Sequence, residues 1–308
     1  MRSFRYRDRV TPVHRLNPFA KLAWLGSIIV LTLILDNPLF LILLFVSTLP
    51  VVRVARVWGE WRSSMRITAY LCGAIILINA LVSSHGATVL FTFPFRMPVM
   101  GTPVITLEAV FYGAAMCLRL LAIISAFAIL TFTVHPDDLM LAMIKVRLPY
   151  KSVLVTSLST RFVPTLIDDN QRITDVQRSR GLELDRGRLA SRVKSRASIV
   201  TALLSNSLDR AVQVAEAMES RAFGTGRGRT FYRDIKMTRT DIATVVFAFL
   251  PLVLGIYLVS SGILSYRYYP TAQAIEMSGT DWALFALMAV LLLMILPLSY
   301  IKRRVDLD

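Results

Sequence analysis

Residues 152–181 read SVLVTSLSTRFVPTLIDDNQRITDVQRSRG, and residues 191–224 read SRVKSRASIVTALLSNSLDRAVQVAEAMESRAFG. Apolar residues recur in both stretches at helical spacing, which predicts two long amphipathic helices over about 152–180 and 191–223. Pro164 is expected to kink the first helix. The predicted apolar stripe of the second helix is Val193, Ala197, Val200, Leu204, Leu208, Ala211, Ala215 and Met218. We expect the two helices to cross and to lie along a membrane surface with these stripes buried against membrane spans.

The two predicted helices end in the same way, with an arginine just ahead of a glycine. Arg180 precedes Gly181, and Arg221 precedes Gly224 by three residues. One interpretation is purely structural, because glycine commonly follows a helix and a basic side chain there complements the helix dipole. The other is that each guanidinium projects from a helix end into an acidic groove of a partner, since its planar fork can bind a carboxylate at two points.

The rest of the chain is typical of a membrane protein. Of its 308 residues, 55% are hydrophobic, against about 45–50% in soluble domains, and the mean hydropathy is +0.58. The apolar runs predict spans near 19–35, 38–52, 68–86, 104–133, 242–262 and 281–300. The first two are short and are separated by the turn signal Asp36-Asn37-Pro38. They form either a tight hairpin, which we favour, or one broken helix.

Basic residues predict the orientation of these spans. Of the 35 Lys and Arg residues, 31 lie in the two termini, in residues 53–67 or in residues 136–240, Lys21 lies at the start of the first predicted span, and only Arg96 and Arg267 lie in the opposite loops. Cytoplasmic loops collect positive charge. Both termini and the central segment are therefore expected in the cytoplasm, and the net charge of +15 fits anionic lipid without any nucleic acid as partner.

The fold class that follows is an all-α integral membrane protein, with about six transmembrane helices and a cytoplasmic pair of long amphipathic helices. We expect an N-terminal tail and four spans in residues 1–135, the helical cytoplasmic segment in 136–240, and two spans and a tail in 241–308. This 4+2 arrangement shows no inverted repeat of the kind found in secondary transporters.

No motif for catalysis, metal binding or a cofactor stands out. Cys72 and Cys117 both fall within predicted spans, without metal-ligand spacing. His135 lies beside acidic residues, but a helix start explains that cluster better than a metal site. The glycine-rich run 224–230 lacks the Gly-Lys-Ser/Thr ending of a phosphate-binding loop. ATP hydrolysis on this chain is therefore not expected.

Arg119 is a basic residue predicted to lie well inside a span. It shares a helical face with Ala115, Ala122 and Ala126, which directs it toward neighbouring helices. A charge within the membrane is costly and marks a candidate functional residue. A structural role, in which Arg119 bonds backbone carbonyl groups of an adjacent helix, is an equal alternative.

Several motifs in a fixed order carry a resemblance to a known family. They are HRLNPFAKL at 14–22, TVHPDDL at 133–139, RFVP at 161–164, and the two helix ends Ser179-Arg180-Gly181 and Ser220-Arg221-Ala222. The chain resembles the transmembrane T component of energy-coupling factor (ECF) transporters, the ABC-type vitamin and metal-ion importers of prokaryotes. In that family the two helix ends are Ala-Arg-Gly triplets on coupling helices. Here serine replaces both alanines, and alanine replaces the second glycine.

The resemblance implies a non-catalytic coupling subunit in a prokaryotic cell membrane. Its partners would be two ABC-type ATPase subunits, which the helix ends would engage, and a separate membrane-embedded protein that binds the substrate. Two other classes stay open as alternatives. A self-contained secondary transporter should have several paired acids within the membrane, whereas Asp36 and Glu108 lie near span ends. An integral membrane enzyme should have a cluster of Asp, His or Glu at a membrane face, for which only 135–138 qualifies.

The predicted orientation can be tested by labelling single cysteines from outside the cell. An impermeant maleimide should react with a cysteine placed near Arg96 or Arg267, because these loops are expected outside. It should not react with one near Arg188, in the predicted cytoplasmic segment. The reverse labelling pattern would contradict the orientation.

Overall fold

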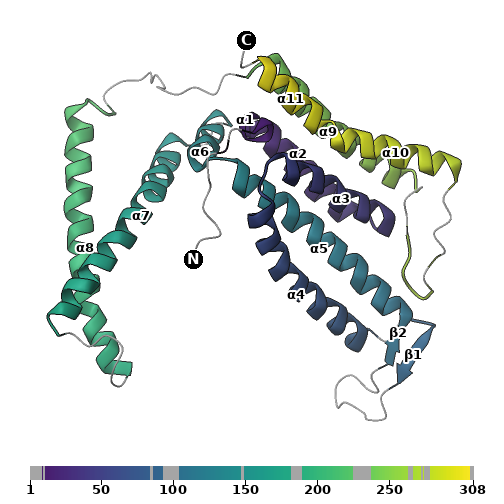
Figure 1. Cartoon of the computed structure of the whole chain (residues 1–308), viewed down its shortest axis with the longest axis horizontal. Coiled ribbons are helices and arrows are strands. Elements are labelled where there is room, and N and C mark those ends of the chain that lie inside the picture. The colour runs from purple at the N-terminus through teal and green to yellow at the C-terminus, as the bar shows by residue number, and fades with distance from the viewer. Residues whose placement is uncertain are drawn as a thin grey trace. The chain divides into compact units, whose positions relative to one another are not determined.

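A computed structural model describes residues 9, 11–83, 86–92, 104–146, 149–181, 189–224, 237–262, 266–271, 273 and 278–305. These residues are almost entirely helical, with one two-stranded antiparallel sheet (Figure 1). The helices are α1 (Pro12–Arg15), α2 (Pro18–Ile34), α3 (Pro38–Val54), α4 (Trp58–Val82), α5 (Leu107–Thr133), α6 (Pro136–Lys145), α7 (Tyr150–Ser179), α8 (Leu189–Ser220), α9 (Arg239–Ser260), α10 (Gly279–Leu293) and α11 (Ile295–Val305). The strands are β1 (Val89–Thr92) and β2 (Val104–Thr106).

The predicted class, an all-α membrane protein, is confirmed. Four stretches are long and apolar enough to cross a membrane, namely α4, α5, α9 and residues 279–302, and α2 and α3 are shorter apolar helices. The chain divides into two compact units. One comprises residues 1–139 and 236–308, and the other comprises residues 140–235.

Asparagine–proline pairs begin both short apolar helices. The side-chain oxygen of Asn17 accepts a hydrogen bond from the backbone N–H two residues later (3.1 Å), and Asn37 does the same (3.0 Å). Pro18 and Pro38 occupy the first helical positions, where the missing N–H costs nothing. The local sequence therefore divides one long apolar stretch into two helices.

The α2 and α3 helices form the hairpin that the sequence favoured. Arg9, which precedes α1, donates to the carbonyl oxygen of Arg56 and pairs with Glu60, both of which follow α3. The end of α3 thus returns to the start of α2. Each helix has 17 residues, or about 25 Å, which is short against a hydrocarbon core of about 30 Å.

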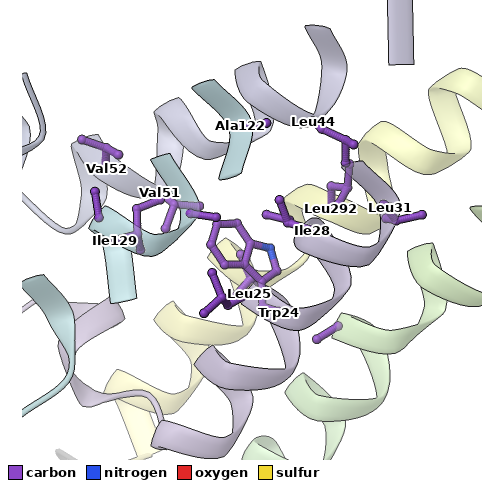
Figure 2. Packing of buried hydrophobic residues seen from close by; sticks show 14 of the residues in the cluster. Trp24, Leu25, Ile28, Leu31, Leu44, Val51, Val52, Ala122, Ile129 and Leu292 are labelled. Carbon is purple, nitrogen blue, oxygen red and sulfur yellow. The ribbon is translucent and has the colours of Figure 1, made fainter. Parts of the chain in front are cut away.

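The core of the first unit surrounds Trp24 on α2. Trp24 belongs to one buried cluster with Val51 of α3, Ile129 of α5 and Leu292 of α10, all labelled in Figure 2. Lipid tails are as apolar as leucine, so close packing holds membrane helices together. At Gly255 of α9 a Cβ would overlap the side chain of Leu31, which shows how closely α9 approaches α2.

The α4 and α5 helices lie side by side, and three of the predicted span boundaries shift. The α4 helix begins ten residues before the expected start at 68, because its buried residues already keep helical spacing there. These are Trp61, Met65, Thr68 and Cys72. Residues 104–106 form β2 instead of the first turn of a span, and the expected final span is divided into α10 and α11 at Met294.

A buried hydroxyl links three of these helices. Ser125 on α5 accepts a hydrogen bond from the indole N–H of Trp61 on α4 (2.9 Å) and lies 2.7 Å from the hydroxyl of Thr48 on α3. Buried polar groups that are fully hydrogen-bonded fix a single packing arrangement. This network therefore sets the register between α3, α4 and α5.

A buried ion pair links the C-terminal helix α11 to the start of α9. Lys302 Nζ on α11 lies 2.6 Å from a carboxylate oxygen of Asp241, whose side chain is fully buried in the first turn of α9. The other oxygen of Asp241 accepts from the backbone N–H (3.1 Å) and the hydroxyl (2.7 Å) of Thr238. One carboxylate thus caps α9 and attaches α11 to it.

Replacing Lys302 with methionine should destabilise the protein strongly. Breaking a buried pair leaves one uncompensated charge, which costs about 3–5 kcal/mol. The expected result is a clearly lower unfolding midpoint of the purified protein in detergent. Arg239→Met, which removes an exposed charge from the same end of α9, should change the midpoint little, and Lys302→Met combined with Asp241→Asn should recover part of the loss. Equal midpoints for Lys302→Met and the wild type would contradict the role of the pair.

Candidate functional site

The first predicted helix end, at the end of α7, is a tight turn with a left-handed glycine. The Ser179 hydroxyl donates to the carbonyl oxygen of Val176 (2.8 Å), and the N–H of Arg180 bonds to the same carbonyl (3.2 Å). Gly181 then has a φ of 83°, which glycine adopts without a steric penalty. The chain therefore turns away directly after the arginine and leaves it at the tip of the helix.

The second predicted helix end, at the end of α8, repeats this geometry without the glycine. The Ser220 hydroxyl donates to the carbonyl oxygen of Ala217 (3.0 Å), and Arg221 follows as the first residue beyond the helix. Ala222 has a φ of 55°, and its N–H bonds to the carbonyl of Glu219 (2.8 Å). A left-handed conformation costs an L-residue with a Cβ about 1–2 kcal/mol. Alanine thus occupies the position of Gly181 and adopts the same turn despite this cost.

The two arginines at these ends are exposed. Within the described part of the chain, neither Arg180 nor Arg221 forms a hydrogen bond or ion pair through its guanidinium. Each guanidinium keeps five N–H donors in a planar fork that matches a carboxylate. Ser179 and Ser220 have the same local role, since each hydroxyl donates a hydrogen bond to the carbonyl oxygen three residues earlier. The matched sequence ends are therefore matched in shape as well.

The α7 and α8 helices are antiparallel, which places the two arginines at opposite ends of the pair. Three side-chain contacts are spread along the length of the pair. They join Tyr150 with Phe223 (ring centroids 6.3 Å), Asp169 with Arg210 (2.8 Å) and Gln177 with Ser198 (3.5 Å). Figure 1 shows the two helices running in opposite directions. The 30 residues of α7 span about 45 Å. The two tips are therefore on the order of 40 Å apart.

The apolar face predicted for α8 is not the face that packs on α7. The contacting face includes the ion-paired Arg210, and among the described side chains of α8, 196–220, the buried apolar residue is Ile199. In the predicted stripe, Val200, Leu204 and Leu208 are each about 60% accessible, and the side chain of Val193 lies outside the described residues. Large exposed apolar surfaces mark sites that lipid or a partner protein covers. Pro164 lies inside α7, which continues past it to Ser179.

Arg119 on α5 holds the turn between α2 and α3. Its guanidinium donates to the carbonyl oxygen of Leu35 (3.1 Å) and pairs with Asp36 (3.0 Å). The hydroxyl of Tyr268 donates to the carbonyl oxygen of Asp36 (2.5 Å) from the other side. Burial raises the pKa of the Tyr268 hydroxyl above its usual range, so this group stays protonated as a donor. Arg119 thus satisfies a helix C-terminus that would otherwise keep unbonded carbonyls.

The structure brings two of the sequence motifs together through a residue that the sequence analysis did not single out. Lys21, within the motif at 14–22, is buried and donates to the carbonyl oxygens of Thr133 (2.7 Å) and His14 (3.1 Å). Thr133 opens the motif at 133–139. The sequence does contain a signal for this contact. A lysine inside an otherwise apolar run indicates a buried polar contact, because such a charge must find polar partners.

The cluster at 135–138 acts as a helix start. The Nδ1 atom of His135 accepts a hydrogen bond from the backbone N–H of Asp137 (3.1 Å), directly before α6. No group of three or more His, Cys, Asp or Glu side chains in the described ranges could hold a metal ion. Cys72 and Cys117 are buried free thiols that contact each other's backbone carbonyls between α4 and α5.

Comparison with known proteins identifies the family. The sequence model of the cobalt transport protein family, CbiQ, matches residues 9–232. The energy-coupling factor transporter transmembrane protein EcfT of Streptococcus equi subsp. equi is 30% identical over 265 residues, which cover 82% of this chain and 94% of that protein. EcfT of Lactococcus lactis subsp. cremoris is 30% identical over 79% of this chain and 91% of its own length. EcfT of Heliobacterium modesticaldum is 35% identical over 55% of this chain and 64% of its own length. The chain belongs to the family of ECF transporter transmembrane proteins.

Family membership and fold together establish the broad function. The chain is the T component of an ECF transporter, a membrane subunit that associates with other components of the transporter. Together with the four candidate spans, the relatives make it a multi-pass membrane protein of a prokaryote. The family match ends at residue 232, so it includes both helix ends and Arg119.

Replacing Arg119 with leucine should weaken folding or assembly and leave substrate preference unchanged. The change removes one charged donor to Asp36 and the carbonyl of Leu35, worth about 1.5–3 kcal/mol per charge-assisted hydrogen bond. The unfolding midpoint and the yield of assembled transporter should both fall. Arg172→Leu, at an exposed position on α7, is the control and should change neither. Normal assembly with altered substrate preference would contradict this structural role.

Proposed function

We propose that this chain is the coupling subunit of an ECF-type ABC importer. It transmits ATP-driven motion of two ATPase subunits to a separate membrane-embedded substrate-binding subunit, for uptake of a vitamin or a metal ion. The contact points with the ATPases are Ser179, Arg180 and Gly181 at the end of α7, and Ser220, Arg221 and Ala222 at the end of α8. ATP hydrolysis takes place on the partner subunits.

The observation that carries this proposal is the pair of matched helix ends. Both ends present an exposed arginine on the same local backbone turn. Because α7 and α8 are antiparallel, one rigid pair displays two equivalent tips on the order of 40 Å apart. Two equivalent tips at that separation suit two ATPase subunits, each with its own docking groove. A helix-capping turn accounts for the left-handed residue after each helix, and the exposed arginine that precedes it at both tips is the feature that supports contact with a partner.

The exposed face of α8 supports a role for a further partner. Val200, Leu204, Leu208 and Val212 follow one another at four-residue spacing, and each is more than half accessible. The α7–α8 pair therefore offers charged tips at its ends and an apolar surface along its length. Under the proposed function the tips bind the ATPases, and the apolar surface meets the substrate-binding subunit or the membrane.

The proposal includes an arrangement in the membrane. Both termini and residues 136–240 lie in the cytoplasm, between four spans in 1–135 and two in 241–308. This placement puts the helix ends on the side where ATP is available. The basic residues support it through their concentration in those segments.

Reversing the charge at both tips should abolish ATPase binding. Removal of one partner from a buried charged pair costs about 2–5 kcal/mol, and reversal costs at least as much. Each 1.4 kcal/mol is about tenfold in affinity. Arg180→Glu combined with Arg221→Glu should therefore eliminate co-purification of the ATPases and transport, while each single change should have a partial effect.

The control removes the same charge away from the tips. Arg172→Glu combined with Arg239→Glu alters two exposed arginines and should leave ATPase binding intact. Loss of the dipole interaction alone would cost the tip variant only about 0.3–1 kcal/mol of helix stability. A tip variant that inserts in the membrane, keeps its ATPases and transports normally would refute the coupling role.

A further inference from the structure

The junction between α3 and α4, residues 53–66, carries a cationic surface that the proposed function does not use. We call it the α3–α4 elbow. Its four arginines, Arg53, Arg56, Arg62 and Arg66, are all exposed. In the ranges that the structure describes, none of them has a carboxylate partner. The only acidic residue of the elbow, Glu60, is already paired with Arg9.

The elbow is held rigidly by its buried side. Trp61 is buried, stacks on Trp58 with ring centroids 4.9 Å apart, and donates its indole N–H to Ser125. Arg56 has a left-handed φ of 57°, and its carbonyl accepts a hydrogen bond from Arg9. The arginines therefore project from a fixed backbone, and their mutual repulsion cannot be relieved by rearranging the chain.

The cations of the elbow follow one line along the protein surface. The guanidinium of Arg53 lies over the ring of Trp58, 5.6 Å from its centroid. Arg62 and Arg66 follow Trp58 at four-residue spacing on α4, so all three share a helix face. Like charges at this spacing destabilise a helix. Since the described chain supplies no counter-charge, an external anion would stabilise this line.

The cationic line continues directly into an apolar surface. Exposed Ile67 directly follows Arg66, and exposed Tyr70 and Leu71 lie about one helical turn further along. They begin the apolar part of α4, which extends to Val82 over about 24 Å. Trp58 is 42% exposed, as expected for a tryptophan at a membrane interface. A soluble acidic partner would match the arginines but not the apolar surface that adjoins them. A phospholipid matches both.

We propose that the α3–α4 elbow binds the headgroup of an anionic phospholipid. The phosphate lies among the guanidinium groups of Arg53, Arg62 and Arg66, which can each donate two hydrogen bonds to it. Trp58 covers the headgroup boundary, and the acyl chains follow the exposed face of α4 beyond Arg66. The bound lipid supplies the missing counter-charge and fixes the depth of α4 in the bilayer.

The test uses the full chain in nanodiscs of phosphatidylcholine, with or without phosphatidylglycerol. After exchange into mild detergent, native mass spectrometry measures which lipid remains bound. The wild type should retain phosphatidylglycerol in preference to phosphatidylcholine. A variant with Arg53→Gln, Arg62→Gln and Arg66→Gln should lose this preference, by roughly fivefold in affinity per arginine, because each cation near an anionic surface contributes about 1 kcal/mol.

The matched control removes three exposed cations elsewhere, with Lys151→Gln, Arg172→Gln and Arg239→Gln. It should retain phosphatidylglycerol as the wild type does, and replacement of the three elbow arginines by lysine should retain an intermediate amount. Brominated phosphatidylglycerol should quench tryptophan fluorescence in the wild type, and less so in Trp58→Phe. The proposal is overturned if the wild type shows no lipid preference or if the glutamine variant and the control behave alike. It is also overturned if the glutamine variant keeps phosphatidylglycerol but loses the ATPases, which would make the elbow a protein interface.

Discussion

Two buried lysines hold the end of the helical bundle at which the α7–α8 segment leaves and returns. Lys21 bonds the carbonyl of Thr133 at the end of α5, and Lys302 bonds Asp241 at the start of α9. A buried ammonium group is costly unless its donors are satisfied. Both lysines therefore fix their partners in place, and these partners flank the segment on both sides. Both anchored positions belong to the first unit, on either side of the inserted sequence.

The bonds of Lys21 and Lys302 give the proposed coupling fixed positions in the first unit. In the first unit, Lys21 holds the end of α5, and the carboxylate of Asp241 caps the start of α9. Within the pair, the Asp169–Arg210 contact braces α7 against α8. Under the proposed function, a force on either tip is shared by the α7–α8 pair.

The turn at Ala222 has the same left-handed backbone geometry as the turn at Gly181, although alanine carries a Cβ. Replacing glycine by alanine at a left-handed position costs about 1–2 kcal/mol, yet the turn at the end of α8 matches the one at Gly181. The N–H of Phe223 bonds to the carbonyl of Met218 (3.0 Å), and its ring packs on Tyr150 of α7. These contacts hold the strained residue in place. Strain that the surrounding structure sustains is common at functional sites.

The sequence by itself determined the features that depend on neighbouring residues. Apolar periodicity, the Asn17–Pro18 and Asn37–Pro38 starts and the glycine at 181 specified the class of fold, the division of α2 from α3 and the shape of one helix end. These follow from backbone hydrogen bonding and steric limits that act within a few residues. Only the tertiary structure decided which face of α8 packs on α7, where α4 begins, and what Lys21 binds. Those outcomes depend on partners distant in the chain, as when Lys21 meets Thr133, and no local pattern encodes such a partner.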